Sequence, residues 1–157
     1  MRVGSGFDVH AFGPGDALLL GGVRIPHGQG VVAHSDGDVL LHALVDALLG
    51  AAGLGDIGEH FPDSNPRWRG VGSGEFVTTT LEMLARRSWR VVNVDLTLLA
   101  QQPRIAPWRD QIRQSIATLL GVSADAVNLK ATTTEHLGFL GRKEGLAAMA
   151  TVLIDQA

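Results

Sequence analysis

The segment DVLLHALVDALLGAAG, residues 38–53, constrains the fold of this chain more than any other stretch. Ser35 or Asp36 is predicted to cap its start and Gly53 to end it. Its apolar residues recur at the spacing of one face of an α-helix, at Leu40, Leu41, Leu44, Val45 and Leu48. The pattern therefore predicts a strongly apolar helix.

A stripe of three polar residues interrupts this apolar helix. His42 lies in its middle, and Asp38 and Asp46 lie one turn before and one turn after it on the same face. A lone histidine on a helix is most often a core residue hydrogen-bonded to a neighbouring aspartate. A helix this apolar, however, has little reason to carry three polar side chains unless they face something polar.

The segment GFDVH, residues 6–10, offers that polar partner. Side chains alternate along a strand, so Asp8 and His10 point to the same side. If this strand packs against the helix, Asp8, His10 and His42 converge as two imidazoles and a carboxylate. Three such ligands with an open fourth position are typical of catalytic zinc, and Asp46 is then predicted to orient the His42 ring. The chain has no cysteine, so any metal must be held by His, Asp or Glu.

Strands and helices alternate along the rest of the chain. Glycine, proline and asparagine in residues 55–74 indicate a mobile surface loop. Predicted strands cover residues 2–10, 90–100, 126–133 and 145–155, with a hairpin at 17–26, and further helices cover 75–88 and 107–121. In the strand 90–100, Val92, Val94, Leu96 and Leu98 are expected on one face. The order predicts an α+β fold: one domain, residues 1–157, with a mixed sheet and helices on one face.

Composition excludes several classes of protein. Hydrophobic residues make up 45% of the 157 residues, which excludes disorder and hints that apolar surface is buried between subunits. The net charge is −3 with no basic stripe, so nucleic acid is not expected as a partner. The stretch MRVGSGFDVHAFG contains no apolar core of a signal peptide, and no apolar run is long enough to span a bilayer. We therefore expect a cytoplasmic enzyme with no membrane partner.

Two further segments combine groups that bind phosphate. His34 and Ser35 come just before the apolar helix, where free backbone N–H groups suit an anion, although an ordinary acidic helix start also explains this stretch. The segment ATTTEHLGFLGRKEG contains hydroxyls and Arg142 for phosphate oxygens, and Glu135 suits Mg²⁺ or Mn²⁺ beside phosphates. Its alternative is a short helical turn with a capping box from Thr132 to Glu135. The segment AQQPRIAP is either a plain loop or a site whose backbone binds a nucleobase.

Four long motifs in this order resemble one enzyme family, the 2-C-methyl-D-erythritol 2,4-cyclodiphosphate synthases of the non-mevalonate route to isoprenoids. They are GFDVH, AHSDGDVLLHALVDALLGAAGLGDIGEHFPD, NVDLTLLAQ and KATTTEHLGFLGRKEGLAA. The resemblance runs from Met1 to the last predicted strand. It implies a phosphorus–oxygen lyase that converts 4-diphosphocytidyl-2-C-methyl-D-erythritol 2-phosphate into the 2,4-cyclodiphosphate and releases CMP. The reaction implied is a metal-assisted, intramolecular phosphoryl transfer.

The resemblance also implies roles for individual residues. Asp8, His10 and His42 match the zinc ligands, Glu135 matches the ligand of Mg²⁺ or Mn²⁺, and His34 and Thr133 match the groups that stabilise the transition state. The implied substrate-binding residues are Asp8, His10, His34, Ser35, Asp56, Ile57, Gly58, Phe61, Pro62, Asp63, Ser64, Asn65, Ala100, Gln101, Gln102, Pro103, Arg104, Ile105, Ala106, Thr132, Thr133, Thr134, Glu135, Phe139 and Arg142. One position departs from the family, which usually carries Lys where this chain has Arg104.

The family forms homotrimers, with the sheets facing a threefold axis and each active site between two subunits. A homotrimer would account for the high apolar content of this chain. Two other functions remain open on the residues alone. One is a metal-dependent phosphohydrolase in which zinc activates water. The other is a non-catalytic protein with purely structural zinc, which the lack of a fourth ligand argues against.

Overall fold

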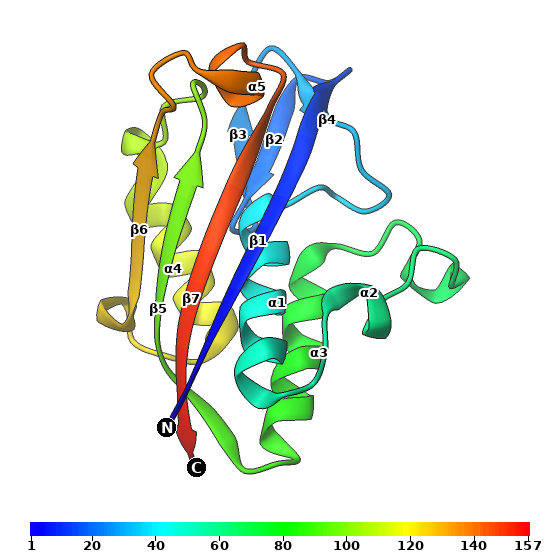
Figure 1. The fold of residues 1–157 in the computed structure, drawn as a ribbon, viewed down its shortest axis with the longest axis vertical. Coiled ribbons are helices and arrows are strands. Elements are labelled where there is room, and N and C mark those ends of the chain that lie inside the picture. Colours follow the sequence, from blue (N-terminus) through cyan, green and yellow to red (C-terminus); the bar gives the residue numbers. More distant parts are fainter.

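A five-stranded sheet is the frame of the structure, a computed structural model that describes residues 1–157. Its strand order is β4-β1-β7-β5-β6 (Figure 1). The strands are β1 (Arg2–Gly13), β4 (Gly30–Val31), β5 (Trp89–Leu99), β6 (Val127–Thr132) and β7 (Gly145–Gln156). Strands β5 and β6 run parallel and the other neighbours antiparallel, which confirms the predicted mixed sheet.

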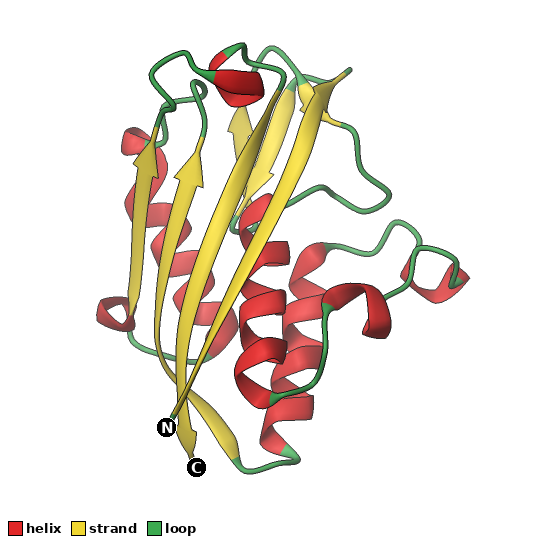
Figure 2. Ribbon diagram, viewed as in Figure 1, coloured by secondary structure: helices red, strands yellow, loops and turns green.

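Three long helices cover one face of this sheet and leave the other uncovered (Figure 2). They are α1 (Val39–Ala52), α3 (Ser73–Ala85) and α4 (Arg109–Leu120). The hairpin of β2 (Ala17–Leu20) and β3 (Val23–Pro26) lies on the same side as the helices, as Figure 1 shows. The short helices are α2 (Ile57–His60) and α5 (Gly138–Gly141), and the 3₁₀ turns are η1 (Pro66–Trp68), η2 (Ala106–Trp108) and η3 (Ala124–Ala126). No helix combines the length and the apolar character needed to cross a membrane.

The central helix α1 lies unusually close to β1. A Cβ atom added to Gly4 would lie 2.0 Å from the carbonyl oxygen of Ala47, and one added to Gly6 would lie 2.0 Å from that of Ala43. Both positions require glycine because any side chain would meet the helix backbone. Glycine on the strand opposite alanine on the helix therefore sets the short distance between the two elements.

The uncovered face of the sheet is apolar along β1 and β7. Val3, Phe7 and Val9 project from β1, and Met149 projects from β7, with exposed fractions of 67%, 54%, 42% and 50%. In register, Phe7 stands opposite Met149. Large apolar side chains grouped on one face of a sheet are typical of a surface that a protein partner covers.

The predicted orientation of Val92 was wrong. Val92 does not share the buried face of Val94, Leu96 and Leu98, because a bulge between Val91 and Asn93 shifts the register and leaves Val92 exposed.

The segment 55–74 is also not a plain surface loop, because it contains α2 and η1. Phe61 and Trp68 are buried in it and pack against Phe76 of α3, with ring centroids 4.8 and 5.8 Å from that of Phe76. Phe61 and Trp68 therefore anchor this segment in the core, and mobility of the residues between them stays a prediction.

The start of α1 depends on Asp38, not on Ser35 or Asp36 as predicted. Its Oδ1 accepts hydrogen bonds from the backbone N–H groups of Leu41 (3.1 Å) and Gly21 (2.9 Å), and its Oδ2 accepts from Gly22 N (2.7 Å). Burial raises the pKa of this carboxyl to about 6, although the three N–H donors act to lower it. One buried carboxyl group thus caps α1 and fastens the β2–β3 turn to it.

Replacing Asp38 should destabilise the whole fold. Asp38→Ala removes the helix cap and leaves buried N–H groups of the hairpin turn unpaired, so we expect a loss on the order of 3 kcal/mol in the free energy of unfolding. Urea unfolding followed by circular dichroism measures it. Asp110→Ala is the matched control, because Asp110 also lies in the first turn of a helix but its side chain is 96% exposed. Equal stability of the two variants would contradict the role given to Asp38.

Candidate functional site

Strand β1 and helix α1 bring the predicted ligand set together. His10 Nε2 lies 2.9 Å from Asp8 Oδ2, and His42 Nδ1 lies 3.1 Å from the same oxygen. The two ring nitrogens are 3.2 Å apart, and one ligand atom of each residue lies within 4.8 Å of the others. The convergence predicted from strand and helix periodicity is confirmed.

The electrostatics of this cluster suit a divalent cation. Burial alone would raise the pKa of Asp8, but hydrogen bonds and positive charge from His10 and His42 lower it to about 2. Burial acts to lower the pKa of His42, but the hydrogen bond and charge of Asp8 raise it above its usual value. The carboxylate is therefore ionised at neutral pH, and two imidazole nitrogens face it. This donor set fits a site with three protein ligands and room for a further ligand.

The far side of the His42 ring meets residues from two other segments. His42 Nε2 lies 2.8 Å from Ser73 Oγ and 3.2 Å from Ser35 Oγ. Asp46, which was predicted to orient this ring, instead accepts a hydrogen bond from Ile57 N (2.8 Å), so that prediction was wrong. Ser73 is the first residue of α3 and belongs to no recognisable motif, so its contact with His42 could not be predicted from the sequence.

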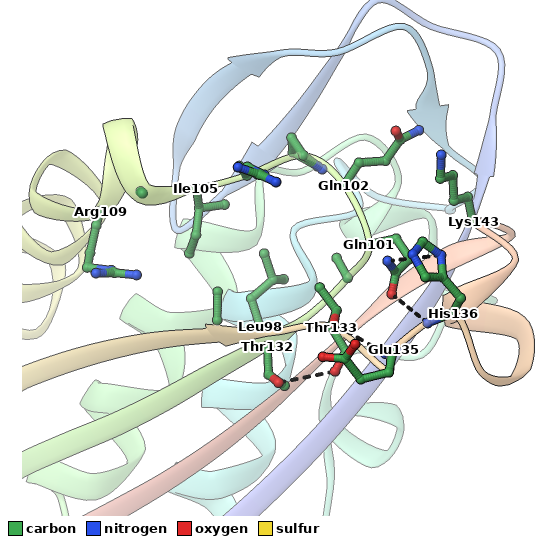
Figure 3. Close-up of a pocket in the computed structure, with 15 residues that line it drawn as sticks. Leu98, Gln101, Gln102, Ile105, Arg109, Thr132, Thr133, Glu135, His136 and Lys143 are labelled. Atoms are coloured by element: carbon green, nitrogen blue, oxygen red, sulfur yellow. Dashed lines mark hydrogen bonds between the residues drawn. The ribbon is translucent and has the colours of Figure 1, made fainter.

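A cavity of about 530 Å³ opens at the ends of β5 and β6 (Figure 3). It gathers most of the predicted nucleotide-binding and phosphate-binding set: residues 100–106, Thr132, Thr133 and Glu135. The cavity is also lined by Arg109, His136 and Lys143, which were not among the predicted site residues. The cavity has a cationic lining, formed by Arg104, Arg109 and Lys143, that suits phosphate groups.

Glu135 sits in a tight turn at the edge of this cavity. Leu137 N donates to Thr134 O (2.9 Å), and both central residues have left-handed backbone angles, with φ of 52° at Glu135 and 63° at His136. Gln101 Oε1 accepts from the backbone N–H groups of Thr134 (3.3 Å) and His136 (3.4 Å), which clamps the turn. Non-glycine residues in this conformation cost energy and are often found at functional sites.

The alternative of a capping box in this segment was wrong. Thr132 donates its hydroxyl to Thr133 O, and Glu135 N donates to the hydroxyl of Thr133.

The other predicted residues lie near these two centres. His34 is exposed, and its Nε2 lies 4.0 Å from Asp63 Oδ2 beside a hollow of about 310 Å³ that Ser64 also lines. Asp56 caps α2 by accepting from Glu59 N (3.0 Å). Phe139 is exposed on α5, and Arg142 pairs with Glu144 (3.1 Å). Strands β7 and β5 lie between β1, which carries Asp8 and His10, and β6, which ends beside the cavity that Glu135 lines (Figure 1). We call Asp8, His10 and His42 the histidine cluster, and this cavity the Glu135 cavity.

Metal binding at the histidine cluster should depend on pH. A cation must displace the proton that Asp8 favours on His42, so affinity should fall as the pH decreases through the raised pKa of His42. Zinc affinity measured at pH 8, 7 and 6 by competition with a chromophoric chelator tests this. His42→Ala should stay folded, bind zinc much more weakly and show a flatter pH dependence. An equally steep profile in that variant would contradict the assignment.

Comparisons with known proteins place this chain among close relatives. The YgbB family matches residues 1–155. A 2-C-methyl-D-erythritol 2,4-cyclodiphosphate synthase of Pseudomonas aeruginosa (strain UCBPP-PA14) is 59% identical over 154 residues, which cover 98% of each chain.

Solved structures agree with this relationship. A 2C-methyl-D-erythritol-2,4-cyclodiphosphate synthase in its CDP-bound form superposes with a TM-score of 0.91 at 39% identity, over 98% of this chain and 100% of that one. The bifunctional IspDF of Campylobacter jejuni superposes with a TM-score of 0.95 at 43% identity. That match covers 99% of this chain and 42% of the bifunctional one.

Proposed function

The chain belongs to the YgbB family, and we propose on that basis that it converts 4-diphosphocytidyl-2-C-methyl-D-erythritol 2-phosphate into 2-C-methyl-D-erythritol 2,4-cyclodiphosphate with release of CMP. The observation that carries the proposal is the cluster of Asp8, His10 and His42, whose ligand atoms lie within 4.8 Å of one another. We propose that residues 1–157 act as one domain and that the enzyme works in the cytoplasm.

The reaction is an intramolecular phosphoryl transfer. An oxygen of the 2-phosphate forms a bond to the β-phosphorus, the bond from that phosphorus to the bridging oxygen breaks, and CMP leaves with the electron pair. No side-chain nucleophile is needed. The protein has to align the attacking and leaving oxygens and stabilise charge on the phosphates.

The histidine cluster is the proposed zinc site. Two imidazole nitrogens and one carboxylate oxygen suit zinc, and the absence of cysteine from the sequence leaves this as the ligand chemistry that the chain can offer. Asp8, His10 and His42 would hold the ion, and zinc bound there would supply Lewis-acid stabilisation to a phosphate oxygen of the substrate.

Glu135 is the proposed protein ligand of Mg²⁺ or Mn²⁺. Such cations are often held by one or two carboxylates together with substrate phosphates, and Glu135 borders the cationic cavity. The turn clamped by Gln101 keeps this carboxylate beside Thr133, as Figure 3 shows. Thr133 and His34 are proposed to donate hydrogen bonds to the phosphates as charge moves in the transition state.

The remaining residues divide between the two ends of the substrate. We assign the cytidine diphosphate part to the cavity lined by residues 100–106 and Thr132, which agrees with the CDP-bound form of a related synthase. Thr134 supports this cavity through its bond to Gln101. The methylerythritol part is assigned to Ser35 and to residues 56–58 and 61–65, and Phe139 and Arg142 are placed near the phosphates and the subunit interface.

We propose a homotrimer whose sheets face a threefold axis. The apolar side chains Val3, Phe7, Val9 and Met149 on the uncovered face support this, because water contact would make them unfavourable in a monomer. The histidine cluster and the Glu135 cavity lie on strands that are not neighbours in the sheet, which also supports an active site formed by two subunits. Neither nucleic acid nor a membrane is proposed as a partner.

The products distinguish this reaction from simple hydrolysis. Incubating the purified chain with the substrate, Zn²⁺ and Mg²⁺ should release CMP and form a cyclic diphosphate, seen by ³¹P nuclear magnetic resonance. A metal-dependent phosphohydrolase would instead release inorganic phosphate or a linear product. The latter outcome would overturn the proposed function.

The shared active site makes a prediction about mixed oligomers. His42→Ala and Glu135→Ala should each have almost no activity alone. Unfolding and refolding them together should restore part of the CMP release, because some interfaces then pair an intact histidine cluster with an intact Glu135.

The matched control is a mixture of His42→Ala and Asp8→Ala, in which every histidine cluster carries a lesion and activity should stay absent. No recovery in mixed oligomers of His42→Ala and Glu135→Ala, verified by mass spectrometry, would reject the site between subunits.

A further inference from the structure

We propose that Ser73 and Asp36 form a hydrogen-bonded relay that orients His42 as a metal ligand. This inference rests on the proposed zinc site and assigns positioning roles to two residues outside it. Neither residue belongs to the metal-binding or substrate-binding set predicted from the sequence. Three separate segments meet at the relay: the loop before α1, α1 itself and the start of α3.

The direction of the relay follows from the orientation of the His42 ring. Its Nδ1 faces Asp8 Oδ2 at 3.1 Å and His10 Nε2 at 3.2 Å, so Nδ1 is the atom available to a metal. A neutral imidazole that uses the lone pair of Nδ1 carries its proton on Nε2. The nearest partner of Nε2 is Ser73 Oγ at 2.8 Å, so the ring donates to this hydroxyl.

Asp36 completes the relay on the other side of Ser73. The Ser73 hydroxyl donates to Asp36 Oδ1, and Asp36 Oδ2 accepts from Ser73 N at 2.8 Å. The hydroxyl can accept from His42 only while its own proton points elsewhere, and the carboxylate fixes that proton. The order is therefore His42 N–H to Ser73 O–H to the Asp36 carboxylate.

The surroundings hold this geometry in place. Ser73 is fully buried, with a relative exposure of 0%. Helix α3 has no side-chain cap at its own N-cap residue, Gly72, and Asp36 takes that role from 37 positions away in the sequence. The positive end of the helix dipole favours a negative charge on Asp36. The carboxylate that caps α3 therefore also polarises the serine that touches His42.

A metal-binding histidine usually donates its second ring N–H to a carboxylate or carbonyl group, which fixes the ring and increases its basicity. Loss of such a partner typically lowers metal affinity about 10- to 100-fold. Ser35 Oγ, at 3.2 Å from the same nitrogen, is the more distant alternative acceptor. We therefore expect the larger effect from Ser73.

The variant Ser73→Ala tests the orientation of the His42 ring without removing the cap of α3. An alanine at this position keeps the backbone N–H that donates a hydrogen bond to Asp36. The cap of α3 therefore remains, while the hydrogen bond to His42 is lost. In the purified full chain, zinc affinity measured against a competing chelator should fall about 10- to 100-fold. The matched control is Thr78→Ala on the same helix. The Thr78 hydroxyl donates only to Gly74 O (3.0 Å), so its loss should leave the zinc affinity unchanged.

A spectroscopic measurement adds a readout that a purely structural role would not change. In the zinc-loaded protein, the Nε2–H proton of His42 should give a slowly exchanging, downfield resonance, and Ser73→Ala should broaden or remove it. Asp36→Asn perturbs the relay from its other end and serves as the second variant if Ser73→Ala does not fold. Its effect on affinity should largely disappear when Ser73 is already alanine.

The outcomes separate this inference from the proposed function. If the wild type binds one zinc per chain and Ser73→Ala keeps both the affinity and the His42 resonance, the relay is wrong and the proposed function stands. Additive effects of Ser73→Ala and Asp36→Asn would also overturn the relay, because Asp36 would then not act through Ser73. A wild-type chain that binds no zinc at the histidine cluster would overturn both.

Discussion

The rest of the structure depends on the close contact between β1 and α1. Gly4 and Gly6 present no side chains to the helix, and Ala43 and Ala47 bring its backbone against them. One residue before Ala43, the helix carries His42, which therefore reaches the strand at Asp8 and His10. A larger residue at either glycine would move α1 outward, and the three ligand atoms would separate before the core itself failed. The packing of α1 against β1 and the convergence of the three ligand atoms thus depend on the same two glycines.

The two aspartates before α1 show how one short acidic stretch connects the start of α1 to two segments far away along the chain. Asp38 is buried, and it joins the start of α1 to the turn of the β2–β3 hairpin. Asp36 caps α3 and contacts Ser73. From the sequence both resemble ordinary acidic residues near a helix start, because their partners lie far away along the chain. Burial of Asp38 raises the pKa of its carboxyl group to about 6.

The features that could be predicted from the sequence followed from the periodicity of strands and helices. Alternation along a strand placed Asp8 and His10 on one side, helical spacing placed His42 on an apolar helix, and both patterns reflect backbone geometry that holds in any fold. The bulge at Val92, the burial of Trp68 and the contact of Ser73 with His42 depend on tertiary packing, which single-sequence patterns do not carry. The resemblance to a known family predicted most of the residues that line the cavity at the ends of β5 and β6, but not the cationic residues Arg109 and Lys143.

The uncovered face links the proposed assembly to the proposed chemistry. Its β1 and β7 half is apolar, whereas on the β5 and β6 half Asp95 pairs with Lys130 and accepts from Asn128 (2.8 Å). These polar groups are satisfied within the sheet, so they need no partner from another subunit, while the apolar half does. The strand β7 that carries part of this apolar surface also keeps β1 apart from β5 and β6. Covering the apolar half with further copies of the chain would remove it from water, and an active site shared between copies would join the histidine cluster of one to the Glu135 cavity of the next, as proposed above.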